Sequence, residues 1–145
     1  MKKQRVLMGF MGTVLDGGFN AKRWERWRPS VNVHQTEGSD IDVVELFHDD
    51  KHEQQALVVR ADIHSVNPNV AIHLHEMNID NPWDFSEVYG KLFDWAKRYP
   101  FDTENNEYWV HITTGTHVVQ ICLFLLVEAR VIPGVLLQTS PPKDK

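Results

Sequence analysis

The greatest potential for chemistry lies in one polar segment, Thr113-Thr114-Gly115-Thr116-His117. It separates an apolar run at 108–112 from a very apolar stretch that begins at about Val118. This pattern predicts a buried strand, a short turn and a helix. Backbone N–H groups at a helix N-terminus favour phosphate and other anions. One threonine would suffice to cap the helix, so the additional threonines, the glycine and the histidine favour a ligand contact.

A second candidate for ligand contact is the glycine-rich stretch GFMGTVLDGG at 9–18, which follows the first apolar run. Its glycines permit backbone conformations and close approaches that side chains forbid, although a simple tight turn would also account for them. The stretch has no complete GxGxxG pattern, and the chain has no Walker A sequence. Neither the usual dinucleotide-binding fold nor P-loop hydrolysis of nucleotides is therefore favoured.

A third candidate is the segment 22–28, which combines four basic residues with two tryptophans. Interleaved bases and aromatics suit a nucleotide strand, since guanidinium groups bind phosphate and rings stack on bases. The alternative is a surface helix in which Trp24 and Trp27, three residues apart, dock into the core while the cations remain solvated. Both interpretations stay open, and Arg23 and Arg28 are candidate outer contacts.

The chain has 8 histidines, which invite a metal site, and His73 and His75 share one face of a predicted strand. There is no HExxH motif and no cysteine pair, so we expect solvated or hydrogen-bonded histidines, no metal and no cofactor. The one cysteine, Cys122, is expected in the core. A chain without an internal disulfide fits the cytoplasm.

Composition limits the class of protein further. A chain of 145 residues with 42% apolar and 24% charged residues is typical of one soluble globular domain. The net charge of −5 argues against non-specific binding to duplex DNA but leaves room for a small basic pocket. The longest strictly apolar run, 121–127, is far shorter than the ~20 residues of a membrane span. No membrane partner is expected.

The elements that must position these residues alternate between strands and helices. Strands are predicted at 5–10, 42–48, 70–77, 108–112 and 134–139. Helices are predicted at 20–27, 50–66, 82–98 and 118–129, with Asp50 as a cap, Pro82 at a first helical position and 31–35 extended after Pro29 ends the first helix. This order predicts an α/β fold with a mostly parallel sheet and helices on both faces.

Ligands of such sheets bind beyond the carboxyl ends of the strands. The glycine-rich loop, the threonine turn and Thr139-Ser140 should all lie at that edge. The last predicted helix, 118–129, is apolar nearly all round. One stripe of it can face the sheet, and the rest needs another partner. We expect a homodimer interface there, the alternative being burial under a further element.

Several segments also resemble a known family. They are GxxGTxLDxG near the N-terminus, RWERWRPSV, NPWDFSEVYGKLFDWAKRYPFD, HITTGTHVVQICLFLLVEAR and LLQTSPP. Over nearly the whole chain they resemble the N-terminal domain of the transcriptional regulators of bacterial RNA-terminal-phosphate-cyclase repair operons. In that family the domain is a CRISPR-associated Rossmann fold, or CARF, sensor.

The resemblance implies that residues 1–140 form a CARF ligand-sensing domain and that 141–145 begin a linker. The linker would lead to an absent AAA+ ATPase domain that drives sigma-54 transcription, followed by a DNA-binding domain. It also implies a cytoplasmic homodimer that binds an RNA fragment with a 2′,3′-cyclic phosphate end, or an oligoadenylate, across its two-fold axis. Binding would relieve inhibition of the ATPase.

The ligand contacts of the family lie in the loop after the first strand and in the turn after the fourth. They map onto Gly12, Thr13, Leu15 and Asp16, and onto Thr113, Thr114, Gly115, Thr116 and His117. No enzymatic activity is expected of the domain itself. The alternative is a metal-independent ring nuclease that cleaves cyclic oligoadenylate, in which Thr13, Thr116 and His117 position the ribose. A scaffold that only dimerises and represses its neighbour is a third possibility.

Overall fold

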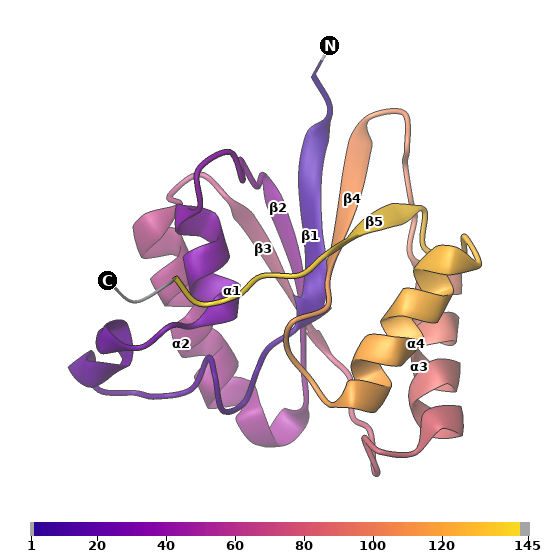
Figure 1. The fold of residues 1–145 in the computed structure, drawn as a ribbon, viewed down its shortest axis with the longest axis horizontal. Helices are drawn as coiled ribbons and strands as arrows, with labels where there is room; N and C mark the ends of the chain where they lie inside the picture. The colour runs from indigo at the N-terminus through magenta and orange to yellow at the C-terminus, as the bar shows by residue number, and fades with distance from the viewer. Residues whose placement is uncertain (1, 143–145) are drawn as a thin grey trace.

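A five-stranded sheet forms the centre of the protein, of which the computed structural model describes residues 2–142. The strand order is β3-β2-β1-β4-β5, and every neighbouring pair is parallel (Figure 1). The strands are β1 (Gln4–Phe10), β2 (Val43–His48), β3 (Ala71–Glu76), β4 (Asn106–His111) and β5 (Gly134–Leu137). The predicted α/β fold and its parallel sheet are confirmed.

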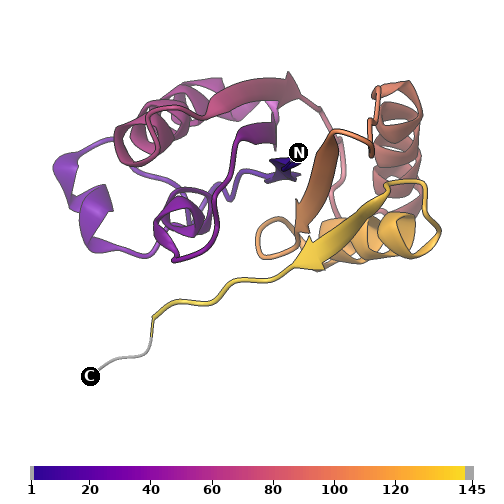
Figure 2. The same ribbon diagram turned by 90° about the horizontal axis from the view of Figure 1, so that it is seen from above.

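Helices cover both faces of the sheet. Among residues 2–142, four are α-helical: α1 (Pro29–Asn32), α2 (Glu53–Val66), α3 (Phe85–Arg98) and α4 (His117–Glu128). Three short 3₁₀ turns are η1 (Ala21–Glu25), η2 (Val33–Gln35) and η3 (Asp50–His52). Figures 1 and 2 show α1 and α2 on one face and α3 and α4 on the other.

The alternation of side chains along β1 divides the core in two. Val6 and Met8 pack into the cluster that contains α3 and α4, whereas Leu7 packs into the cluster that contains α1 and α2. Successive side chains of a strand point to opposite faces. A central strand covered on both faces is therefore apolar over its buried length, as β1 is after Gln4 and Arg5.

The chain reverses its direction of travel across the sheet between β1 and β4. From β1 it moves outward through β2 to β3, and it then returns to the other side of β1 for β4 and β5. The loops after β1 and β4 diverge at this switch point, which is where doubly wound sheets bind ligands.

The segment 20–35 differs from its prediction. Asn20 does cap the first turn, accepting the N–H of Lys22 at 3.0 Å, but η1 is a 3₁₀ turn of five residues. Pro29 begins α1 instead of ending a helix, because its ring preorganises φ for the first helical position. Val31 is buried within that helix, so residues 31–35 are helical and not extended.

Two helix starts were also misplaced. Asp49, not Asp50, accepts the N–H of His52 at 3.0 Å and caps η3, so α2 itself begins at Glu53. Asp84 caps α3 by accepting the N–H of Ser86 at 3.1 Å, so α3 begins at Phe85, three residues after Pro82.

Residues 143–145 of the predicted linker lie outside the described residues. Among the helices of residues 2–142, none combines the length and the apolar character needed to cross a membrane.

Candidate functional site

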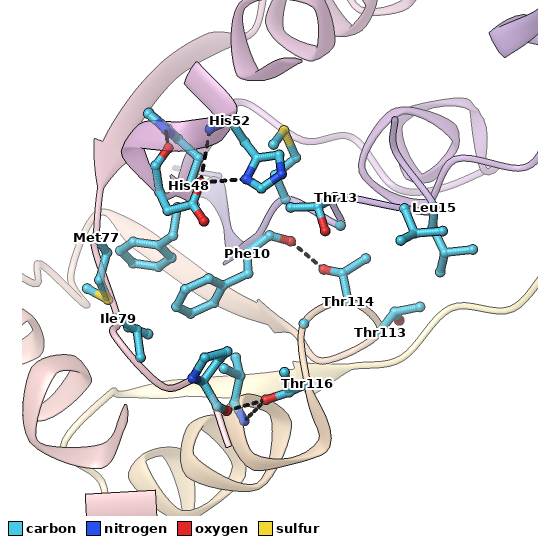
Figure 3. A pocket seen from close by; sticks show the side chains of 18 of the residues that line it. Phe10, Thr13, Leu15, His48, His52, Met77, Ile79, Thr113, Thr114 and Thr116 are labelled. Carbon is cyan, nitrogen blue, oxygen red and sulfur yellow. Dashed lines mark hydrogen bonds and ion pairs between the residues drawn. The ribbon is translucent and has the colours of Figure 1, made fainter. Parts of the chain in front are cut away.

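A cavity of about 460 Å³ opens at the carboxyl ends of β1, β2, β3 and β4 (Figure 3). Its walls come from four connecting segments, within the ranges 10–15, 47–52, 77–83 and 113–119. The volume lies within the range of small-molecule sites. The predicted meeting of the glycine-rich loop and the threonine turn at this edge is confirmed.

The turn before α4 takes its shape from glycine and threonine. Gly115 has φ of +92°, and a Cβ there would meet Val119 Cγ1 at 3.0 Å, so a side chain would be strained and crowded. Thr116 is the N-cap of α4 and accepts the N–H of Val119 at 3.1 Å. The sequence therefore starts the helix at His117, one residue before the predicted start.

The hydroxyl groups of the turn all have partners within the protein. Thr114 donates to the carbonyl oxygen of Phe10, and Thr116 donates to that of Pro82 at 2.7 Å (Figure 3). Thr113 accepts the N–H of Thr139 at 2.8 Å. These bonds join the turn to the β1–η1 loop, to the β3–α3 loop and to the segment after β5.

Backbone N–H groups and one side chain remain for a ligand. The first N–H groups of an α-helix have no acceptor within the helix. Thr116 satisfies the N–H of Val119, which leaves those of His117 and Val118. The exposed imidazole of His117 lines the cavity beside them. This end of the cavity suits an anion.

The glycine-rich loop approaches the turn closely at Gly12. A Cβ on Gly12 would lie 2.9 Å from Thr114 Cγ2 and 3.2 Å from Asp16 Oδ2, so only glycine fits between them. Beyond it, Thr13 and Leu15 are exposed and line the cavity. The structure thus brings the predicted residues Gly12, Thr13 and Leu15 together with Thr113 to His117.

Asp16 does not line the cavity. It is 0% exposed and its carboxylate holds the loop in shape, accepting from Gly12 N at 2.7 Å, Ser30 N at 2.9 Å and Ser30 Oγ at 2.6 Å. Burial raises the pKa of Asp16, although these hydrogen bonds act in the opposite direction. Its predicted contact with a ligand is corrected to a structural role, because no carboxylate oxygen faces the cavity.

Arg23 and Arg28 also lie outside the cavity. Both donate to the buried carboxylate of Asp62 on α2, Arg23 Nε at 2.8 Å and Arg28 Nη1 at 2.7 Å. Arg28 is 1% exposed and also donates to the carbonyl oxygen of Asp16 at 3.1 Å. Trp24 is 43% exposed. Arg23 and Arg28 are thus held by Asp62, whereas Lys22 and Arg26 are exposed. The exposure of Trp24 overturns its predicted docking into the core, and a contact of this segment with nucleotides stays a prediction.

Sequence reasoning missed the loop after β2. His48 and His52 line the cavity, and Asp49 Oδ1 lies 2.6 Å from His52 Nδ1, which orients that imidazole (Figure 3). The signal that would have found them is positional. Parallel strands bring their carboxyl ends to one edge, so the residues after β2 had to adjoin those after β1.

The opposite side of the cavity is apolar and aromatic. Phe10 and Phe47 lie with ring centroids 5.1 Å apart, and Met77 and Ile79 continue this wall. Trp83, which is 61% exposed, stands at its edge on the β3–α3 loop. A cavity with helix N–H groups at one end and aromatic rings at the other can hold a phosphate and a nucleobase together.

The histidines of β3 form no metal site. His73 Nδ1 and His75 Nε2 lie 3.1 Å and 2.6 Å from Glu45 Oε1, and Tyr99 donates to the other oxygen at 2.6 Å. Within residues 2–142, no group of three or more His, Cys, Asp or Glu side chains could hold a metal ion.

A doubly wound parallel sheet with a cavity at its switch point defines a Rossmann-like α/β domain. The chain belongs to the RtcR family, the regulators of RNA terminal phosphate cyclase, whose family model matches residues 3–145. It is 46% identical over 144 residues to the transcriptional regulatory protein RtcR of Escherichia coli strain K12. That match covers 99% of this chain but 27% of the E. coli protein, so the chain spans about a quarter of that relative's length.

Two solved structures share the fold. Csm6 of Enterococcus italicus, bound to cyclic hexa-2′-fluoro-hexa-dAMP, matches 97% of this chain and 35% of its own with a TM-score of 0.66 and 22% identity. Can2 of Sulfobacillus thermosulfidooxidans, in complex with cyclic tetra-adenylate, matches 94% of this chain and 32% of its own, with a TM-score of 0.60 and 9% identity.

Proposed function

We propose that this domain senses an RNA end with a 2′,3′-cyclic phosphate, or an oligoadenylate, for a transcriptional activator of RNA repair. The observation that carries the proposal is the cavity itself, in which the N-terminus of α4 faces an apolar, aromatic wall. Membership of the RtcR family supports a regulatory role. The cyclic oligoadenylates in the Csm6 and Can2 complexes support the chemical class of the ligand.

In this proposal the phosphate lies at the turn before α4. The N–H groups of His117 and Val118 and the imidazole of His117 receive it, and the base packs on Phe10 and Trp83. No lysine or arginine is among the described residues that line the cavity. Backbone N–H groups and imidazoles therefore carry the anion, an arrangement that favours one or two phosphates over a long polyanion.

The site would lie across the two-fold axis of a homodimer. α4 begins at the cavity and exposes Ile121 (50%), Phe124 (42%) and Leu125 (36%) along one side. A second copy on this face would place two cavities side by side. A ligand that binds one arrangement of the pair more tightly shifts the population toward it. That shift would relieve inhibition of an AAA+ domain, to which residues 141–145 begin the linker, with residues 1–140 as the sensing unit.

The test is calorimetric titration with short oligoadenylates, cyclic and linear, with and without a 2′,3′-cyclic phosphate. We expect tight binding of at least one, with one ligand per two chains. His117→Ala should weaken binding about tenfold or more, the worth of one hydrogen bond to a charged group, without loss of stability. Arg60→Ala, an exposed cation on α2, is the matched control. Absence of binding by every probe would defeat the proposal.

Thr116→Ala is a less specific test of the same turn. Thr116 caps α4 and donates to the carbonyl oxygen of Pro82, and loss of an N-cap costs about 1 kcal/mol of stability. Weaker binding in this variant would therefore mix the effect on the fold with the effect on the ligand.

A second candidate function is a metal-independent ring nuclease, and the pair of Asp49 and His52 favours it. The 2′-hydroxyl of a bound ribose would attack the adjacent phosphorus and break its bond to O5′. His52 would accept the hydroxyl proton, and O5′ would take a proton from water as it leaves. The products are a 2′,3′-cyclic phosphate and a 5′-hydroxyl.

Long incubation with cyclic tetra- and hexa-adenylate tests this second function. Linear products that vanish in His52→Ala would support cleavage. If wild-type protein binds the ring and releases it intact, the domain only senses.

A further inference from the structure

We infer that Thr139 is a positioning residue of the ligand turn, and that an anion bound at the turn strengthens the hold of Thr113 on the segment after β5. This inference rests on the proposed function and assigns a regulation to the same site. Thr113 lines the cavity, whereas Thr139 lies outside it.

A chain of polar contacts runs from β4 to the turn. His111 Nε2, at the end of β4, lies 2.8 Å from Thr139 Oγ1. Thr139 Oγ1 lies 3.2 Å from Thr113 Oγ1, and the N–H of Thr139 donates to Thr113 Oγ1 at 2.8 Å. Along the same pair of strands, the N–H of Ile112 donates to the carbonyl oxygen of Leu137 at 2.9 Å. Thr139 thus extends the pairing of β4 with β5 beyond the last residue of the strand.

The proton of the Thr113 hydroxyl is the least well held in this chain. The acceptors within its reach are the carbonyl oxygen of Thr139 at 3.4 Å and Thr139 Oγ1 at 3.2 Å, and in the second contact either hydroxyl can donate. Both distances exceed the 2.7–2.8 Å at which hydroxyl bonds are commonest. As an acceptor, in contrast, Thr113 Oγ1 is well paired, because the N–H of Thr139 donates to it at 2.8 Å. A phosphate oxygen at the turn would therefore take this proton readily.

When the Thr113 hydroxyl donates its proton to an anion, the hydrogen bonds from His111 through Thr139 to Thr113 can all point in one direction. A hydroxyl has one proton and two lone pairs. With its proton on the anion, Thr113 Oγ1 can accept both the N–H and the hydroxyl proton of Thr139. Thr139 Oγ1 can then accept from His111 Nε2. Burial lowers the pKa of His111 to about 4, so at neutral pH the ring carries one proton, and the tautomer with that proton on Nε2 makes this bond. Hydrogen bonds that point the same way along a chain strengthen one another.

The segment held in this way is the route by which the chain leaves the sheet. In Figure 1 it passes from β5 across to the side of α1. There Thr139, Ser140 and Pro142 share a groove with Trp27 and Val33. The E. coli relative is longer than this domain, which matches 27% of it. A ligand bound at the turn would thus stabilise the segment after β5, through which the chain leaves the sheet.

The experiment measures amide exchange of Thr139 and ligand affinity in the same variants. The probes are an oligoadenylate ending in a 2′,3′-cyclic phosphate, cyclic tetra-adenylate and, as an uncharged control, adenosine. We expect a phosphate-bearing probe to slow exchange of the Thr139 amide by about fivefold or more, the equivalent of one hydrogen bond. Adenosine should leave the exchange unchanged.

The variants separate positioning from mere structure. Thr139→Val keeps the shape but loses the hydroxyl, and we expect affinity to fall about fivefold. Thr139→Ser should restore it, and Ser140→Ala, at the exposed next residue, should match wild type. Without any ligand, Thr113→Val should speed exchange of the Thr139 amide, because that N–H loses its acceptor.

Each outcome decides. If no probe binds wild-type protein, the proposed function fails and this coupling fails with it. If a phosphate-bearing probe binds but neither the Thr139 amide nor the affinity of Thr139→Val changes, the coupling alone is overturned. Equal exchange in ligand-free wild type and Thr113→Val would show that Thr113 does not hold the segment, and would overturn it as well.

Discussion

Buried carboxylates, at the scale of single residues, hold the loops around the cavity. Asp16 fastens the glycine-rich loop to the start of α1, and Asp62 fastens two arginines to α2. Burial by itself raises the pKa of Asp62, but the hydrogen bonds from both arginines outweigh it and lower the pKa. These groups shape the site without touching a ligand.

Asp16→Asn should therefore reduce stability. The amide nitrogen would face a donor, either Gly12 N or Ser30, and leaving one buried partner unsatisfied costs about 1–3 kcal/mol. Urea unfolding measures the loss. Asp94→Asn, on the exposed side of α3, is the control and should be neutral. Full stability of Asp16→Asn together with lost binding would instead place Asp16 at the ligand.

Glu45 makes stability depend on pH. Burial by itself raises the pKa of this carboxyl, but hydrogen bonds outweigh burial and lower it below the usual value of 4.5. The donors are His75, Tyr99 and His73. A depressed pKa contributes stability that is present above the unfolded value of 4.5 and is lost as pH falls through the folded value.

We expect the urea midpoint of wild-type protein to fall from about pH 5 downward, and to fall less steeply in Glu45→Gln. Glu104→Gln, at an exposed position, should follow the wild-type profile. If the urea midpoints of wild type and Glu45→Gln changed with pH in parallel, Glu45 would have the same proton affinity in the folded and unfolded states.

At the scale of elements, the strands were predictable and the short helices were not. Strands covered on both faces, such as β1, are continuous apolar runs bounded by glycine or polar residues, a signal carried by the sequence alone. The short helices η1 and α1 instead depend on the bonds from Arg23 and Arg28 to Asp62, 39 and 34 residues away. No local pattern reports such a contact.

The same distinction explains which part of the site was predicted. The glycine-rich loop and the threonine turn have unusual local composition, so they could be found. The β2–α2 and β3–α3 loops contribute His52 and Trp83 only because the strand order places β2 and β3 beside β1. The burial of Asp16, like that of Arg28, depends on packing between distant segments, which the local sequence does not reveal. Asp16 was therefore assigned to the ligand.

Gly115→Ala tests the turn as an element. A side chain at φ of +92° is strained and would meet Val119 at 3.0 Å, so we expect a loss of about 1–2 kcal/mol in unfolding free energy. Gly90→Ala is the matched control. It lies within α3 with nothing within 4 Å of its Cβ, so it should gain about 0.5–1 kcal/mol. A neutral Gly115→Ala would mean that the turn relaxes in solution.

At the scale of the whole molecule, α4 joins the cavity to the surface proposed for dimerisation. Val119, Cys122, Leu123 and Leu126 are buried against the sheet, as expected for Cys122, while the other side of the helix stays exposed. Exposed apolar groups one helical turn apart form a continuous stripe. Such a stripe gains stability when a second copy covers it.

Phe124→Glu should convert the protein to a monomer, because the charge would have to be desolvated at the centre of the interface. Sedimentation velocity measures the mass. Val135→Glu is the control, since Val135 is also exposed (58%) but lies on the edge strand β5, and it should leave the mass unchanged. Since the ligand is proposed to bridge two copies, Phe124→Glu should also lose affinity for oligoadenylate, and raising the protein concentration should partly restore it. A variant that is monomeric yet binds as tightly as wild type would place the complete site within one chain.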